Sequence, residues 1–132
     1  MFMPSQLLMT DPRSAIVEIG EMFFRDSEAA IRVFGDSMAP TYPGGCVISV
    51  RECKESFIVP GYVYLVETGN NRYLARLYYS ADKASYRCIS DNTSVHQSGS
   101  MKGEFLYPEF LIPRSEVKRL WNVVGIVRKE TI

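Results

Sequence analysis

Apolar and polar positions alternate over short stretches in the middle of the chain, and proline or glycine interrupts the alternation at intervals. Five stretches rich in β-forming residues are predicted to be strands: 30–35, 46–50, 62–68, 72–80 and 85–91. A sixth strand is predicted over 120–130, with a glycine break at Gly125. Many short strands at this spacing indicate an all-β barrel or sandwich-like fold rather than a parallel βαβ sheet.

The composition of the segments between the strands predicts turns and loops. The sequence "TGNNR" at 68–72 predicts a hairpin turn, and the polar, Gly/Ser-rich stretch 92–104 predicts a surface loop. Residues 15–24 have strand character but are flanked by charges, and no helix-turn-helix pattern fits the first thirty residues. We interpret residues 1–28 as an N-terminal arm or linker and 29–132 as one domain.

The charge balance argues against a protein that binds duplex DNA on its own. Fifteen Lys and Arg residues offset fifteen Asp and Glu residues, and no basic stripe is visible. The one basic cluster, "RSEVKRL" at 114–120, is interpreted as a solvated face because apolar and acidic residues interrupt it. Four tyrosines could suggest a surface that stacks single-stranded nucleic acid, but strand alternation favours core and sheet-face positions for them: Tyr62, Tyr64, Tyr73 and Tyr79.

Neither a membrane segment nor a cofactor is expected. No apolar run approaches the length that spans a bilayer, and the N-terminus lacks the features of a signal peptide, so we expect a cytoplasmic protein. Three cysteines, Cys46, Cys53 and Cys88, do not form a disulfide framework and are expected to be small buried hydrophobic residues. His96 fits no zinc-ligand spacing and is expected in a loop, so no metal and no small-molecule cofactor are predicted.

One short stretch, "GDSMAPTYPGG" at 35–45, suggests specific chemistry. Its serine, Ser37, could act as a nucleophile only if a neighbouring base accepted the hydroxyl proton. His96 lies in a predicted loop without an orienting acid, and a Ser-Lys pair needs a lysine on an adjacent strand. Taken alone, the stretch could also be a turn that its prolines stiffen.

This stretch resembles the nucleophile box of the LexA-type S24 peptidases, which include phage-type repressors and UmuD-type mutagenesis proteins. Three further stretches are similar to later boxes of that family and occur in the same order: "GYVYLVETGNNRYLARLYY", "SDN" and "LWNVVGIVRK". The resemblance implies an all-β "β-clip" fold of short strands and hairpins, a homodimer, and Ser37 at the nucleophile position. It also implies a set of residues that support the nucleophile loop: Gly35, Asp36, Met38, Pro40 and Thr41.

The chain departs from the family pattern where the general base belongs. The family's hairpin carries Lys-Arg-Leu, whereas this chain reads "ARL", so Ala75 occupies the lysine position and Arg76 and Leu77 match its neighbours. Arg76 is a poor substitute, because a guanidinium stays protonated and alternation turns its side chain to the other strand face. The usual Ala-Gly or Cys-Gly cleavage bond is also absent upstream, the nearest analogue being Ile19-Gly20, and "GGC" at 44–46 replaces the usual Gly-Asp.

Two functional interpretations follow from the resemblance. The first is the C-terminal dimerisation and regulatory domain of a bacterial or phage-type repressor that does not cleave itself, with DNA bound only through an N-terminal module absent from this chain. The alternative is a degenerate or active-site-substituted UmuD-like protein of SOS mutagenesis and translesion synthesis. Either natural loss or deliberate replacement of the lysine explains Ala75, and the missing cleavage bond favours natural loss. Type I signal peptidases also have a Ser-Met box, but they need a membrane anchor. No such segment is recognisable in this sequence, so this interpretation is disfavoured.

Overall fold

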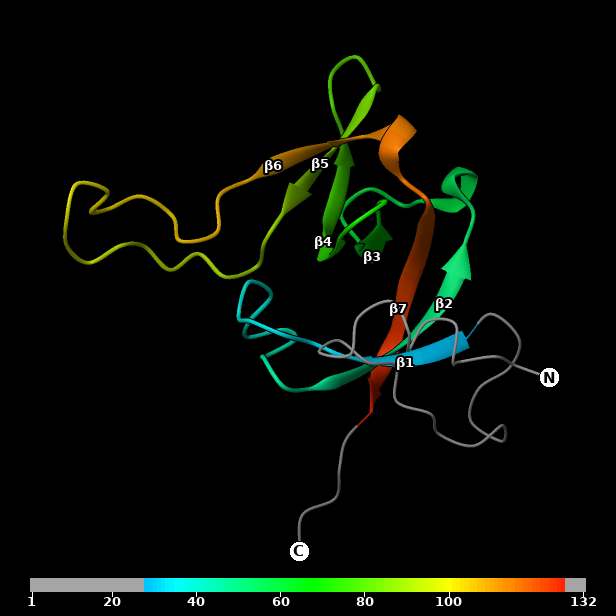
Figure 1. Cartoon of the computed structure of the whole chain (residues 1–132), viewed down its shortest axis with the longest axis horizontal. Coiled ribbons are helices and arrows are strands. Elements are labelled where there is room, and N and C mark those ends of the chain that lie inside the picture. The colour runs from blue at the N-terminus through cyan, green and yellow to red at the C-terminus, as the bar shows by residue number, and fades with distance from the viewer. Residues whose placement is uncertain (1–27, 128–132) are drawn as a thin grey trace, which may run out of the picture.

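The computed structural model describes residues 28–127, and they form a nearly all-β structure (Figure 1). Its seven strands are β1 (Glu28–Arg32), β2 (Val47–Cys53), β3 (Val63–Glu67), β4 (Arg72–Tyr79), β5 (Ser85–Ile89), β6 (Phe110–Pro113) and β7 (Arg119–Val127). Two 3-10 turns, η2 (Glu55–Phe57) and η3 (Arg114–Glu116), precede β3 and β7. The all-β prediction is confirmed.

The strands form one antiparallel sheet in the order β1-β2-β7-β3-β4-β5-β6. Strands β3 to β6 follow one another as neighbours, and β7 returns to pair between β2 and β3. The predicted hairpin joins β3 to β4, where the Thr68 N–H donates to the Asn71 carbonyl at 2.9 Å. The order leaves β1 and β6 as the two edge strands of the sheet.

Two apolar clusters hold the sheet together on its opposite faces. The first contains Ala29, Ile31, Val33, Ile48, Val50, Leu65 and Trp121. The second contains Tyr64, Val66, Ala75, Leu77, Tyr86, Cys88, Ile112 and Leu120. Because successive side chains of a strand point to opposite faces, the central strands β3 and β7 contribute to both clusters. Burial on both faces explains the nearly continuous apolar runs in these two strands.

The structure differs from the sequence prediction at both edges of the sheet. Strand β1 begins at Glu28 rather than at residue 30, because the buried Glu28 carboxylate pairs with Arg51 of β2. Strand β6 was not predicted, because it has only four residues and ends in Pro113, which lacks a backbone donor. Most of the predicted arm, and residues 15–24 within it, lies outside the described residues.

The predicted surface loop is confirmed as a long excursion between β5 and β6 (Figure 1, yellow). His96 lies in this loop, where its N–H donates to the Glu104 carbonyl at 2.9 Å. Of the three cysteines, only Cys88 is fully buried, and burial raises the pKa of its thiol to about 12; Cys46 and Cys53 are half-buried. Tyr62 is exposed, contrary to the expectation for the tyrosines, because it precedes β3. The described residues contain no helix with the length and hydrophobicity required to cross a membrane.

Candidate functional site

Ser37 lies in a tight loop that connects β1 to β2. The loop is closed at its base by two backbone hydrogen bonds, from the Val33 N–H to the Cys46 carbonyl and from the Gly45 N–H to the Val33 carbonyl, both at 2.8 Å. Within it, the Tyr42 N–H donates to the Met38 carbonyl at 2.8 Å, which winds the residues after Ser37 into a turn. We call residues 35–46 the serine loop.

The residues predicted to support Ser37 all lie in this loop, and several have identifiable contacts. Met38 is completely buried, whereas Pro40 is exposed after a cis peptide bond. The Asp36 carboxylate accepts a hydrogen bond from the Gly44 N–H at 3.2 Å. A Cβ atom at Gly44 would lie 2.8 Å from that carboxylate and 2.8 Å from the Gly35 carbonyl, so the close approach requires glycine. The loop is therefore packed and hydrogen-bonded as a unit.

The tripeptide Ser90-Asp91-Asn92, which follows β5, attaches the serine loop to the sheet. The Asn92 backbone N–H donates to the Ser37 carbonyl at 2.9 Å, and its side-chain amide donates to the Asp36 carbonyl at 2.8 Å. The Thr41 hydroxyl donates to the Asp91 carboxylate at 2.6 Å. The sequence did not predict this role of "SDN", because its partners lie about 50 residues away in the chain.

Arg76 completes this attachment from β4. Its guanidinium donates to both carboxylate oxygens of Asp91, at 2.6 Å and 3.0 Å, and to the Gly61 carbonyl at 2.8 Å. These hydrogen bonds hold the pKa of the Asp91 carboxyl below its usual value and raise the pKa of Arg76. Burial raises the pKa of the neighbouring Tyr42 hydroxyl. Asp91 is therefore ionised and paired at neutral pH.

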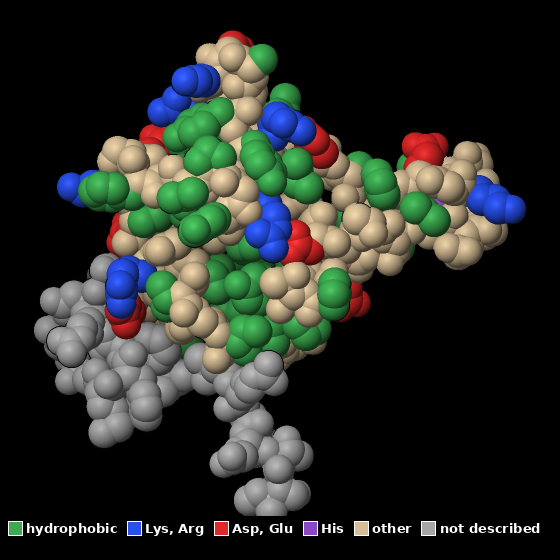
Figure 2. Space-filling model, turned by 180° about the vertical axis from the view of Figure 1, so that it is seen from behind, with side chains coloured by type: hydrophobic (Ala, Val, Ile, Leu, Met, Phe, Trp, Pro, Cys, Tyr) green, Lys and Arg blue, Asp and Glu red, His purple; other side chains and the backbone are tan. Residues whose placement is uncertain are grey.

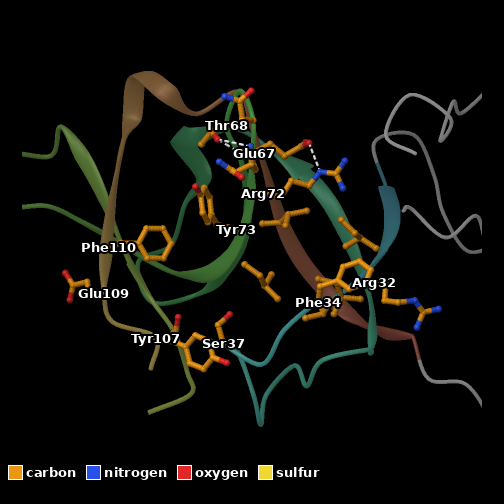
Figure 3. Close-up of a pocket in the computed structure, with 18 of the residues that line it drawn as sticks. Arg32, Phe34, Ser37, Glu67, Thr68, Arg72, Tyr73, Tyr107, Glu109 and Phe110 are labelled. Atoms are coloured by element: carbon orange, nitrogen blue, oxygen red, sulfur yellow. Dashed lines mark hydrogen bonds and ion pairs between the residues drawn. The ribbon is translucent and has the colours of Figure 1, made fainter. Parts of the chain in front are cut away.

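Ser37 faces a groove of about 960 Å³ (Figure 3). Both edge strands reach this groove, through Ile31 and Arg32 of β1 and Phe110 of β6, and the β3–β4 hairpin forms a third wall. Figure 3 shows Ser37 beside Tyr107, with Phe34 on the β1 side and Tyr73 near Phe110. Hydrophobic side chains also gather across the middle of the face seen in Figure 2. The lining of the groove combines apolar and aromatic side chains with polar and charged ones, and Ser37 lies on its wall.

A polar group lies at the hairpin side of the groove. The Glu67 carboxylate accepts a hydrogen bond from the Trp121 indole at 2.7 Å and forms an ion pair with Arg72 at 3.3 Å. Across the groove, Glu109 pairs with Arg87 of β5. The described residues contain no group of three potential metal ligands. The sequence did not predict that Glu67 and the aromatic residues Phe34, Tyr73, Tyr107 and Phe110 line one groove, because segments distant in the chain bring them together.

Ala75 is buried in the second apolar cluster and does not belong to the described lining of the groove. It pairs with Tyr64 of β3 on one side. On the other side, the β4–β5 ladder ends at Arg76 and Ile89, and continuing that register by one residue places Ala75 opposite Ser90. Ser90 lines the groove together with Ser37. The side chain at position 75 therefore lies in apolar surroundings, outside the described lining of the groove.

The fold and the serine loop define an all-β protein with a serine at the wall of a groove. The chain matches the family model described as Peptidase S24-like over residues 6–103, and it belongs to that family. The match starts ahead of the described residues and ends in the loop between β5 and β6. A comparison with curated proteins gave no match.

Proposed function

We propose that this chain is the C-terminal dimerising and regulatory domain of a bacterial or phage-type transcriptional repressor, with its nucleophile position retained and self-cleavage lost. One observation carries the loss of self-cleavage: Ser37 lies on a groove whose described lining contains neither lysine nor histidine. A serine hydroxyl without a base stays protonated at neutral pH and is a poor nucleophile. The arginines of the lining, Arg32 and Arg72, stay protonated and cannot act as that base.

The residue at position 75 supports the same conclusion. In the resemblance to S24 peptidases this position carries the general base, and here it is a buried alanine whose methyl group accepts no proton. Among the described residues, those clustered with Ala75, such as Tyr64 and Leu77, carry no amine that could replace the missing one. The serine loop would then serve as a structural element of the groove rather than as a catalytic one.

The proposal is tested on the unsubstituted chain with a serine-directed phosphonate, from neutral to moderately alkaline pH, followed by intact-mass and peptide mass spectrometry. We expect no adduct on Ser37 and no cleavage of the chain. Ser37→Ala supplies the background, and an active serine hydrolase verifies the reagent. An adduct on Ser37 that is absent from Ser37→Ala would contradict the proposal.

Dimerisation, the second part of the proposal, rests on β7. This strand pairs with β2 along its length, whereas its pairing with β3 ends at Asn122. Among the described strands none pairs with the β3-side edge of residues 123–127, where Val124 and Ile126 are 46% and 39% exposed. An unpaired edge with apolar side chains invites another strand. A second copy of β7 across a two-fold axis would satisfy both edges at once.

Sedimentation velocity tests this assembly. We expect a dimer at micromolar concentration and a shift toward monomer in Ile126→Glu, which places a charge on the open edge. Leu111→Glu is the matched control, because Leu111 is also exposed, at 58% against 39% for Ile126, but lies on the edge strand β6, which does not pair with β7. A monomeric unsubstituted chain, or equal effects of the two substitutions, would refute dimerisation through β7.

A further inference from the structure

Arg76 connects three segments that are distant in the sequence. From β4 it donates to the carbonyl of Gly61, which precedes β3, and to both carboxylate oxygens of Asp91, which follows β5. Asp91 in turn accepts the hydroxyl of Thr41 in the serine loop at 2.6 Å. The path from β4 to the serine loop therefore consists of three charge-assisted hydrogen bonds, two from Arg76 to Asp91 and one from Thr41 to Asp91.

The bonds to Asp91 also fix the backbone that contacts Ser37. Asn92, the next residue, donates its backbone N–H to the Ser37 carbonyl at 2.9 Å, and the Asp91 N–H lies 3.4 Å from the Met38 sulfur. Movement of Asp91 would displace these contacts together. Both charged side chains of the pair are partly buried: 34% of the Arg76 side chain and 15% of the Asp91 side chain are exposed.

We propose that Arg76 is a positioning residue that acts through Asp91 to hold the serine loop, and so the Ser37 wall of the groove, in its observed conformation. The guanidinium suits this role because its planar fork matches a carboxylate and because it stays positively charged at any working pH. The role is independent of the proposed loss of self-cleavage. Its failure would leave that proposal standing.

A second arginine–carboxylate pair on the same sheet provides a matched comparison. Arg87 of β5 donates to both oxygens of Glu109, at 2.6 Å and 3.0 Å, the same distances as in the Arg76–Asp91 pair. Both of its side chains are more exposed, and the hydrogen bonds of this pair do not involve the serine loop. Loss of this pair should therefore leave the loop unchanged.

The charge on Asp91 gives the proposal a pH dependence. The groups around its carboxyl are Arg76 from β4 and Tyr42 from the serine loop, while the Asp36 carboxylate is turned to the Gly44 N–H. Because Arg76 lowers the pKa of Asp91 in the folded state, the contribution to loop stability persists at neutral pH and is lost as the pH falls through that lowered value. Without Arg76 the main cause of this lowering is lost, so falling pH should no longer weaken the loop in this way.

Hydrogen exchange on the full chain, followed by mass spectrometry or NMR across acidic and neutral pH, tests the proposal. In Arg76→Gln we expect exchange in residues 36–46 to be at least about 10-fold faster than in the unsubstituted chain, with the core strands unchanged. Loss of protection of the loop at acidic pH, expected in the unsubstituted chain, should be reduced in Arg76→Gln, whose loop is already less protected at neutral pH, and absent in Asp91→Asn. Arg76→Lys should restore part of the protection, and Arg87→Gln should have no effect on the loop.

Unchanged exchange in residues 36–46 of Arg76→Gln would overturn the proposal, as would an increase shared equally with Arg87→Gln. If Arg76→Gln fails to fold, Thr41→Val decides the question, since it removes the hydroxyl that bonds to the Asp91 carboxylate and leaves the Arg76–Asp91 pair in place. Selective opening of the loop in Thr41→Val supports the proposal. Exchange like that of the unsubstituted chain refutes it.

Discussion

The serine loop and the segment of β4 that carries Ala75 are held in different ways. The loop is fixed by directional contacts: backbone bonds at its base, the Asp36–Gly44 bond, and the ties from Asp91 and Asn92. Ala75 is surrounded by apolar side chains and contributes only a methyl group to the second cluster. Packing tolerates a small apolar residue there, whereas the loop requires particular residues at several positions. If the proposed function is right, the serine loop keeps its structure although the proton acceptor is lost.

The largest expected effect comes from removing the apolar anchor of the serine loop. Met38 is completely buried, so Met38→Ala should lower the free energy of unfolding by about 2–5 kcal/mol through lost burial and a residual cavity. Urea denaturation measures this change. Met101→Ala is the control, since Met101 is exposed and its replacement should change stability by less than about 0.5 kcal/mol. Equal effects would show that the loop has no such anchor.

A charged residue in the second cluster should cost nearly as much. Ala75→Lys places an amine among apolar side chains, and burial lowers the pKa of a lysine. The native state then binds fewer protons than the unfolded state between the lowered pKa and the ordinary lysine value. Stability should therefore rise with pH across the alkaline range, from a deficit of about 2–4 kcal/mol near neutral pH. Thermal denaturation at several pH values checks the slope, and a flat profile would mean that the amine reaches solvent.

The smallest of these effects concerns the backbone of the loop. Gly44→Ala should destabilise the chain by about 1–3 kcal/mol, because the new Cβ would press on Asp36 and on the Gly35 carbonyl. Gly69→Ala in the β3–β4 hairpin is the matched control, since nothing lies within 4 Å of the added Cβ. Chemical denaturation distinguishes the two. If Gly44→Ala is as stable as Gly69→Ala, the loop adapts, and its directional contacts are weaker than described.

Much of the sheet could be predicted from the sequence because its strands alternate locally. The predicted strand 72–80 agrees with β4 to within one residue, and the hairpin at 68–72 lies where Gly69 and Asn70 indicated it. The serine loop was also recognisable, since its residues are contiguous. The Arg76–Asp91 pair and the groove were not predictable, because they depend on side chains 15 or more residues apart that meet only after the sheet curls. Strand β6 was not predicted because four residues are too few to show a clear alternation of apolar and polar side chains.

The measurement that tests the central claim most directly is the gain of Ser37 reactivity in Ala75→Lys. The protein is incubated with a serine-directed phosphonate from neutral to moderately alkaline pH, beside Ala75→Met, which adds similar length without an amine, and the double variant Ala75→Lys, Ser37→Ala. We expect an adduct on Ser37 only in Ala75→Lys, increasing with pH as the amine loses its proton. No Ser37 adduct in folded Ala75→Lys, or equal labelling of Ala75→Met, would show that position 75 is not the vacant place of the base.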